Sequence, residues 1–393
     1  MKLTRSMVLV VSLLAVGGIL FLSYSKLWRT KAQTPPPNLM ILTPTYQFNV
    51  LKNPTGVTVV RDAQGVPHLY IADSGNHVIH HFRPGGTLSI AAGISGAQGY
   101  VNGSNQTAKF DYPTGLAGTN YVIPTAPQGF LQYTNCQEIY VNDTQNFVVR
   151  KFKVNVGPYG ATMGGCDAIT QTAAGNHNAG MVDGSSTSAS FRQVAGMEKT
   201  SSGYCYMADA GNHAVRGWNG SNVTTLAGSG SPGFADGNGS AAQFMVPAKV
   251  TKASSGYLYV ADVGNNAIRM IDSANNVTTC AGAGPTNAGY VNGQGTQARF
   301  YRPTSIVYNA PDNMLYIADS HNNVIRKMDS YGNVTTYAGT GTPGLVNGSL
   351  SQAQFDKPID IAIFNGVMYV ADSMNNVIRR IDMVNGTVTT YIS

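Results

Sequence analysis

Residues Leu315–Arg326 read LYIADSHNNVIR, and variants of this stretch occur five more times in the 393-residue chain. The aspartate of the motif recurs at intervals of 53 to 70 residues, at Asp73, Asp143, Asp209, Asp262, Asp319 and Asp372. Self-similarity at such a period is the signature of a repeat architecture, in which each copy is one structural unit. The chain is therefore predicted to consist of six related units.

Each copy of the motif predicts a β-hairpin. Leu315–Ala318 is a run of bulky, β-branched or aromatic residues, which favours a strand. Asp-x-x-Asn then interrupts the run, because Asp and Asn side chains can hydrogen-bond the backbone of a tight turn. A second apolar run, Val324–Met328, leads back along the first.

Two further elements complete the unit. A threonine-rich run follows the hairpin, as in Asn333–Gly339 (NVTTYAG), and a glycine-rich connector such as Gly289–Phe300 comes next. In most copies a proline then opens another apolar run, so one period holds four short strands. Six such units, with no helical periodicity between them, predict an all-β fold, a six-bladed β-propeller of four-stranded antiparallel blades.

The hairpin motif, the Val-Thr-Thr strand and the connector together resemble the NHL-repeat β-propeller family over residues 48–393. The resemblance implies an interaction scaffold whose turns and connectors form one broad binding face. Some six-bladed propellers similar to this family are enzymes, such as an amidating lyase with central calcium and zinc, but no position here matches their catalytic residues by motif. The expected function is a binding or adhesion scaffold without a cofactor; the alternative is a propeller hydrolase or lyase with a central Ca or Zn ion.

The N-terminus precedes the repeats and differs from them in character. Residues 1–28 contain an apolar stretch, Met7–Tyr24, bounded by basic residues, which predicts either an uncleaved membrane anchor or a signal peptide cleaved after Ser25. Residues 29–47 contain four prolines and are predicted to form an extended stalk. Both readings of the first segment place the propeller outside the cytoplasm, secreted or membrane-anchored.

The charge distribution indicates which chemical class of partner the propeller binds. Five of the positive charges behind the formal net charge of +6 lie in the first 31 residues, which leaves 20 Lys and Arg against 19 Asp and Glu in the remaining chain. A nearly neutral propeller lacks the basic patch that nucleic-acid binding requires. Only 11% of all residues are charged, which is typical of an extracytoplasmic surface. A protein, peptide or glycan ligand is therefore expected, and no nucleic acid.

Cysteines and glycosylation motifs bear on whether the propeller is extracytoplasmic. Cys136 and Cys166 border or lie in two insertions of the second repeat, 122–135 and 153–167, so they form either one disulfide or two free thiols. Cys205 and Cys280 occupy apolar strand positions and are expected to be buried. Asn-x-Ser/Thr occurs ten times, which indicates either glycosylation or simply turns that enter strands.

The repeated charged residues are expected to have a structural role. Each motif aspartate is predicted to hold its own turn together with the Asn three residues later. Seven residues after the aspartate comes an arginine in five copies: Arg150, Arg216, Arg269, Arg326 and Arg379. The arginine is predicted to lie opposite the Tyr three residues before the aspartate, in a stacking contact or an ion pair between blades. His77 and His213 occupy equivalent positions after the turn and are the candidates for a small metal site.

The connectors supply the candidate binding residues. Their variable aromatic positions, Tyr100, Phe234 and Tyr290, offer flat apolar area beside amides, and two connectors carry a carboxylate, Asp183 and Asp236. This mix suits a glycan or an extended peptide. The alternatives are that the connector pattern serves only to form tight turns, or that the insertions of the second repeat carry the site.

Overall fold

The computed structural model describes residues 7–16, 19–28, 51–62, 64–118, 136–155 and 168–393. The chain divides into two units, Met1–Phe48 and Asn49–Ser393. In the first unit, β1 (Met7–Val16) pairs antiparallel with β2 (Ile19–Trp28). No helix of the described residues is long and apolar enough to cross a membrane. The anchor or signal peptide stays a prediction, and the predicted stalk, residues 29–47, lies outside the described part of the chain.

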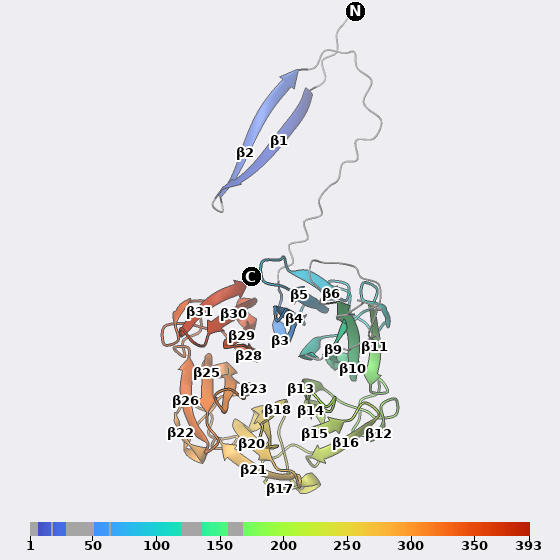
Figure 1. Cartoon of the computed structure of the whole chain (residues 1–393), viewed down its shortest axis with the longest axis vertical. Helices are drawn as coiled ribbons and strands as arrows, with labels where there is room; N and C mark the ends of the chain where they lie inside the picture. Colours follow the sequence, from blue (N-terminus) through green and yellow to red (C-terminus); the bar gives the residue numbers. More distant parts are fainter. Residues whose placement is uncertain (1–6, 17–18, 29–50, 63, 119–135, 156–167) are drawn as a thin grey trace, which may run out of the picture. The chain divides into compact units, whose positions relative to one another are not determined.

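The second unit is a ring of six antiparallel sheets in sequence order, the six predicted blades (Figure 1). Blade 1 comprises β3 (Pro54–Arg61), β4 (Pro67–Asp73), β5 (Val78–Phe82) and β6 (Ser89–Ala92). Blade 2 comprises β7 (Gly103–Ser104), β8 (Pro113–Gly118), β9 (Cys136–Asp143), β10 (Val148–Asn155) and β11 (Ile169–Ala174). Blade 3 comprises β12 (Gly184–Ser185), β13 (Val194–Lys199), β14 (Cys205–Asp209), β15 (Ala214–Trp218) and β16 (Asn222–Ala227).

The remaining blades repeat this pattern. Blade 4 comprises β17 (Gly237–Asn238), β18 (Pro247–Lys252), β19 (Leu258–Asp262), β20 (Ala267–Ile271) and β21 (Asn276–Ala281). Blade 5 comprises β22 (Gly293–Gln294), β23 (Pro303–Asn309), β24 (Met314–Asp319), β25 (Val324–Met328) and β26 (Asn333–Ala338). Blade 6 comprises β27 (Gly348–Ser349), β28 (Pro358–Phe364), β29 (Val367–Asp372), β30 (Val377–Asp382) and β31 (Thr387–Ile392).

The six-bladed propeller is thus confirmed, with one addition to the predicted four strands. In blades 2 to 6 the incoming connector contributes a two-residue strand that pairs with the start of the outermost strand, as Gly237 pairs with Val277. The connector glycine adopts φ 153°, in the region that disfavours L side chains, which explains why the connector pattern requires glycine there. The connectors therefore belong to the sheets they precede.

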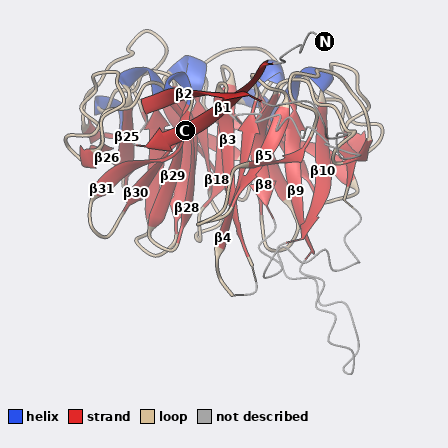
Figure 2. Cartoon of the chain, turned by 90° about the horizontal axis from the view of Figure 1, so that it is seen from above, coloured by secondary structure: helices blue, strands red, loops and turns tan. Residues whose placement is uncertain are grey.

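The turn after each motif aspartate is a single 3-10 turn in blades 2 to 6. These turns are η1 (Thr144–Asn146), η3 (Ala210–Asn212), η5 (Val263–Asn265), η7 (Ser320–Asn322) and η8 (Ser373–Asn375). The residue that follows each turn is left-handed, as at Asn323 with φ 55°, a conformation that Asn tolerates better than most residues. The turns all lie on one side of the ring, called the turn face below (Figure 2). Two further 3-10 segments, η4 (Gly239–Ala241) and η6 (Gly295–Gln297), lie in connectors.

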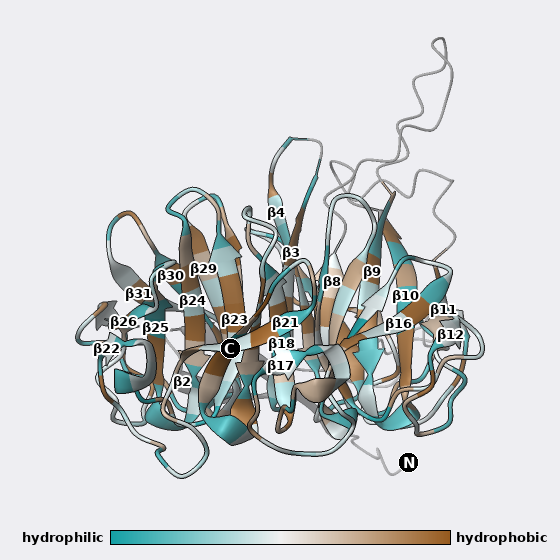
Figure 3. Ribbon diagram, turned by 90° about the horizontal axis from the view of Figure 1, so that it is seen from below, coloured by the Kyte–Doolittle hydropathy of each residue, from teal (hydrophilic) through white to brown (hydrophobic). Residues whose placement is uncertain are grey.

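The core lies between the blades. Buried side chains of one blade pack against those of the next, as Ala318 and Ile325 of blade 5 pack against Val370 of blade 6. Since each blade is covered on both faces, its second strand is apolar at nearly every position before the motif aspartate, as in β24, rather than at alternate ones (Figure 3). This explains why the repeats show apolar runs and no simple alternation.

The ring closes between blade 6 and blade 1. Blade 1 is formed by the N-terminal end of the propeller and blade 6 by its C-terminal end, and β28 packs against β3. Leu69 and Ile71 of blade 1 share a buried cluster with Ile378 of blade 6. Among the described residues no strand is exchanged across this seam.

The cysteines occupy both described and undescribed regions. Cys136 is buried at the start of β9, while Cys166 and most of the two insertions fall outside the described residues, so the pairing stays a prediction. Cys205 is a buried free thiol and Cys280 a half-buried one. Burial raises the pKa of both thiols to about 11, which makes them poor nucleophiles at neutral pH.

A pair of histidines lies in the interior of blade 1. His68 Nδ1 is 2.9 Å from His81 Nε2, and the His81 ring stacks on Tyr70 with centroids 4.9 Å apart. Burial, together with the neighbouring His68 and Arg83, lowers the pKa of His81 to about 4. Burial also lowers the pKa of His68, although Asp62 opposes the shift. The pair is therefore neutral at physiological pH.

We expect the histidine pair to make the propeller less stable in mild acid. Between pH 6.5 and about 4 the unfolded chain binds a proton at His81 that the folded chain does not, so the free energy of unfolding falls as pH falls. The slope is about 1.4 kcal/mol per pH unit for a fully titrating group. His81→Phe retains the ring contact without the titration and should reduce this slope, measured by denaturant unfolding at a series of pH values.

The readout is the difference between the variant and the natural protein. Burial raises the pKa of Asp143, Asp262 and Asp319 to about 6, so these carboxyls titrate in the same range with the opposite sign, equally in both proteins. Parallel pH profiles of the two proteins would contradict the prediction.

Candidate functional site

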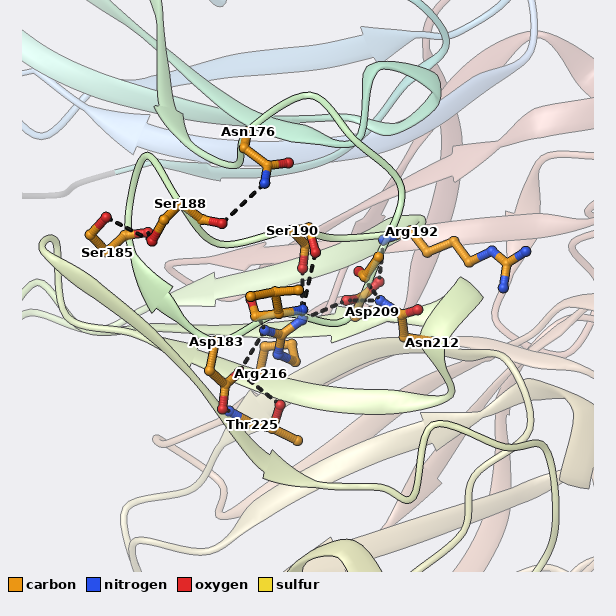
Figure 4. A network of polar contacts seen from close by, with 12 residues as sticks. Asn176, Asp183, Ser185, Ser188, Ser190, Arg192, Asp209, Asn212, Arg216 and Thr225 are labelled. Carbon is orange, nitrogen blue, oxygen red and sulfur yellow. Dashed lines mark hydrogen bonds and ion pairs between the residues drawn. The ribbon is translucent and has the colours of Figure 1, made fainter.

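The motif aspartates hold the turn face together. In blade 3, Asp209 Oδ2 accepts hydrogen bonds from Asn212 Nδ2 at 2.8 Å and from Arg216 Nη1 at 3.0 Å, and Oδ1 accepts one from the Arg192 backbone N–H at 3.0 Å (Figure 4). The aspartate thus joins its turn, its hairpin and the incoming connector. The same contacts to Asn and Arg recur at Asp143, Asp262, Asp319 and Asp372.

The motif arginines extend this network to the connectors. Arg216 is fully buried, and its Nη2 donates to Val182 O at 3.0 Å and to Asp183 Oδ1 at 2.7 Å. Arg150, Arg269, Arg326 and Arg379 make equivalent bonds to an Asn or Asp of the preceding connector. In blade 1 a histidine replaces the arginine, and His80 Nε2 lies 2.9 Å from Asp73 Oδ2.

The predicted placement of the arginine was wrong in its register. The hairpin closes over four residues, so Asp209 pairs with Ala214 and Arg216 lies opposite Met207, not Tyr206. The ion pair is accordingly formed within one hairpin instead of between blades.

The connector aromatics cover the arginines. The centroids of the Tyr100, Phe234 and Tyr290 rings lie 5.0 to 5.1 Å from the guanidinium carbons of Arg150, Arg269 and Arg326. The same guanidinium carbons lie 5.2 to 5.3 Å from the ring centroids of Phe110, Phe244 and Phe300, which are buried. The three predicted binding residues therefore have a structural cation–π contact, and their role in binding stays a prediction.

The two connector carboxylates are similarly engaged. Asp183 is half-exposed, and besides Arg216 it accepts hydrogen bonds from the Thr225 backbone and hydroxyl. Asp236 makes the matching contacts to Arg269 and Thr279. Burial alone would raise the pKa of each carboxyl, but these hydrogen bonds outweigh it and lower the pKa. Most of their acceptor capacity is used within the fold.

The rim of the central channel is formed by the two residues before each innermost strand. The second rim residue is left-handed at five positions: Asn53, Tyr112, Val246, Arg302 and Lys357. The preceding blade holds this backbone: His213 Nδ1 accepts the Val246 N–H at 3.1 Å, and Asn266 Oδ1 accepts the Arg302 N–H at 2.9 Å. The candidate metal ligands His77 and His213 thus serve as acceptors in seams between blades.

An apolar arc, defined as Met245, Val246 and Tyr301, lies on the rim of blades 4 and 5. These side chains are 38%, 39% and 43% exposed. Val246 has φ 57°, which is strained for a β-branched residue. The exposed Arg192 and Arg302 flank the arc, and the rim of blades 3 to 5 carries no Asp or Glu.

The channel mouth beneath the rim contains a cavity of about 150 Å³. It is lined by the second and third residues of the innermost strands: Thr55, Thr114, Gly115, Ala195, Gly196, Ala248, Lys249, Thr304, Ile359 and Asp360. Lys249 Nζ of blade 4 lies 2.7 Å from Asp360 Oδ1 of blade 6. In the described residues no three His, Cys, Asp or Glu side chains gather as a metal site, which the hydrolase or lyase alternative would need here.

The sequence contains a signal for this pair in a position that breaks the repeat pattern. The third residue of the innermost strand is glycine in blades 1 to 3, at Gly56, Gly115 and Gly196. A Cβ at Gly56 would come within 2.0 Å of Thr114 O, so the blades approach too closely there for a side chain. Lys249 and Asp360 occupy the equivalent positions in blades 4 and 6. A charged residue in place of glycine is therefore the signal in the sequence for a group that lines the channel.

We expect Arg216→Met to lower the free energy of unfolding by about 3–5 kcal/mol, because the buried Asp209 loses its cation and the connector loses its donors. Arg216→His should lower the free energy of unfolding less, since His80 in blade 1 shows that a histidine at this position can reach the motif aspartate. Denaturant titration of both variants measures the difference. A Met variant as stable as the natural protein would show that the network is dispensable.

Comparisons with known proteins agree with this architecture. No family model matches the chain. The chain is 28% identical over 342 residues to the chloroplastic protein SUPPRESSOR OF QUENCHING 1 of Arabidopsis thaliana, covering 81% of this chain and 29% of that protein. It is 27% identical over 365 residues to NHL repeat-containing protein 2 of Gallus gallus, covering 84% of this chain and 46% of that protein. The chain thus matches less than half of each relative's length.

A solved structure shows the same fold. A Bacteroides thetaiotaomicron protein of unknown function superimposes with a TM-score of 0.56 at 16% identity, covering 84% of this chain and 69% of that one. With its recurring hairpin motif, its six blades and these relatives, the chain belongs to the NHL-repeat β-propeller family.

Proposed function

We propose that this propeller is an interaction scaffold that binds a peptide segment of a partner protein on its turn face. The observation that carries the proposal is the apolar arc, three exposed apolar side chains held on a strained rim. Strained backbone persists where the surrounding structure enforces it and is found preferentially at functional sites. An apolar side chain of the partner would pack against Met245 and Tyr301.

The charge around the arc selects the chemistry of the peptide. Arg192 and Arg302 flank the arc, and the rim acids, Asp111 and Asp356, belong to blades 2 and 6. An apolar anchor with acidic neighbours complements this surface. A glycan is less well served, because one face of each connector aromatic already covers a guanidinium. A nearly neutral propeller gives nucleic acid no corresponding support.

The proposed setting is extracytoplasmic, either secreted or held at a membrane by the N-terminal segment. The low charge content, the apolar stretch in residues 1–28 and the predicted Cys136–Cys166 disulfide support it. The glycosylation motifs are consistent with the same route. The alternative of a metal-dependent hydrolase or lyase has less support, because Asp360 is the one carboxylate in the lining of the channel-mouth cavity.

We expect peptides selected from a displayed random library on the full chain to carry an apolar residue with acidic neighbours. The double variant Met245→Ser/Tyr301→Ser should capture these peptides at least tenfold more weakly, since the anchor contact is lost, with little change in melting temperature. The matched control is Tyr331→Ser/Val384→Ser, whose side chains are 79% and 85% exposed in hairpin turns on the opposite face.

Undiminished capture by the arc variant would refute the docking site. Loss of capture on Tyr100→Ala instead would move the site to the connectors, and loss on shortening residues 122–135 would move it to that insertion.

The compartment has its own test. In protein exported to an oxidising compartment, we expect a Cys136–Cys166 linked peptide in a non-reduced digest that disappears on reduction, measured by mass spectrometry. Cys166→Ser should lower the free energy of unfolding by roughly 2–4 kcal/mol, because the closed loop restricts the unfolded chain. Complete alkylation of both thiols without reduction would argue against the disulfide.

A further inference from the structure

The cavity at the channel mouth carries a second, more specific inference. We propose that it is a receptor for a single carboxylate, which binds to Lys249 Nζ. The inference rests on the proposed function, since the carboxylate would belong to the peptide docked on the adjacent apolar arc. It would be either a C-terminal carboxylate or the side chain of an acidic residue.

The unused hydrogen-bonding groups in the cavity are N–H donors of Lys249. A lysine ammonium has three N–H donors, and within the described residues Lys249 Nζ bonds to Asp360 Oδ1. Asp360 is well supplied with donors: Oδ1 also accepts from Ser305 Oγ at 2.8 Å, and Oδ2 accepts from the Val57 N–H at 3.0 Å. An acceptor entering the cavity therefore finds unused N–H groups, whereas a cation finds a carboxylate already engaged.

The remaining lining strengthens the case for an anion. The Thr114 hydroxyl donates to Ala195 O at 3.0 Å and the Thr304 hydroxyl to Ile359 O at 2.8 Å, so both serve the seams between blades. Ala248 and Ile359 contribute apolar walls. Lys249 is already paired with Asp360, so an entering anion would be held by charge-assisted hydrogen bonds from the remaining N–H groups of Lys249 and not by an uncompensated charge.

The size of the cavity limits the ligand to a small group. Sites for drug-sized ligands occupy about 300–1,000 Å³. The channel cavity measures about 150 Å³, which admits a carboxylate on a short stem and is too small for a nucleotide.

Asn142 is a second departure from the repeat pattern, beside Gly115, although it does not itself line the cavity. It is fully buried, and neither its Oδ1 nor its Nδ2 has a hydrogen-bond partner. The five other blades have alanine at this position, as at Ala72. A Cβ built on Gly115, a cavity-lining residue, would lie 2.7 Å from Asn142 Nδ2.

The test uses the full chain and acetate as the probe. We expect saturation-transfer NMR at constant ionic strength to show saturable acetate binding in the millimolar range. Lys249→Met should reduce the acetate signal at least fivefold. Ala248→Leu should do the same by filling the cavity, with the Lys249–Asp360 pair intact. Lys327→Met, which removes a half-buried lysine on the other face near Asp312, is the control and should bind acetate normally.

Each outcome decides the question. If Lys249→Met does not fold, Ala248→Leu carries the test alone; acetate binding by Ala248→Leu equal to that of the natural protein overturns the inference. Met245→Ser/Tyr301→Ser should lose peptide capture and retain acetate binding, so undiminished peptide capture by this variant refutes the docking site alone. Conversely, peptide capture without acetate binding refutes the carboxylate receptor alone.

Two modified peptides distinguish the sources of the carboxylate. Amidation of the C-terminus should weaken capture at least fivefold if the C-terminal carboxylate enters the cavity. Replacement of one Asp or Glu by its amide should do so if a side chain enters. If neither change weakens capture, the carboxylate receptor plays no part in peptide binding and the inference fails for the peptide.

Discussion

The buried Asp–Arg pair beneath each turn is the interaction on which the rest of this propeller depends. Asp209 and Arg216 together bond the turn, two strands and the connector that arrives from the preceding blade. A connector whose regular structure is little more than a two-residue strand is thereby fixed over the blade. The rim follows directly from that connector, so its unusual backbone conformation is positioned by an ion pair several residues away.

The sequence was sufficient for the fold because the information is local and repeated. A hairpin motif, a threonine-rich strand and a connector recur with little change, and each element predicts its own conformation. The register could not be predicted: Arg216 lies opposite Met207 because the turn holds four residues, three in a 3-10 conformation and one left-handed, which the letters Asp-x-x-Asn do not specify. The connector aromatics were similarly ambiguous, since exposed stacking on a ligand and stacking on an arginine require the same residue type.

The candidate site could not be predicted in the same way. Lys249 and Asp360 are 111 positions apart and meet only because the ring closes. In a repeat protein the recurring residues build the scaffold, so the information about function lies in the positions that break the pattern. Asn142 in place of alanine, and a charge in place of glycine, are such positions, and the role of Lys249 and Asp360 depends on their contact between blades 4 and 6.

The seam between blades 6 and 1 has a mechanical consequence. Because the described strands of each blade come from a single stretch of chain, no shared strand holds this seam shut, and side-chain packing with a few hydrogen bonds must resist its opening. Asp360 lies at this seam: its Oδ2 accepts a hydrogen bond from the Val57 N–H across the seam, and its Oδ1 accepts one from Lys249 Nζ. A ligand that binds Lys249 would thus perturb the same carboxylate that bonds across the seam. Occupancy of the channel would in this way change how stably the ring stays closed.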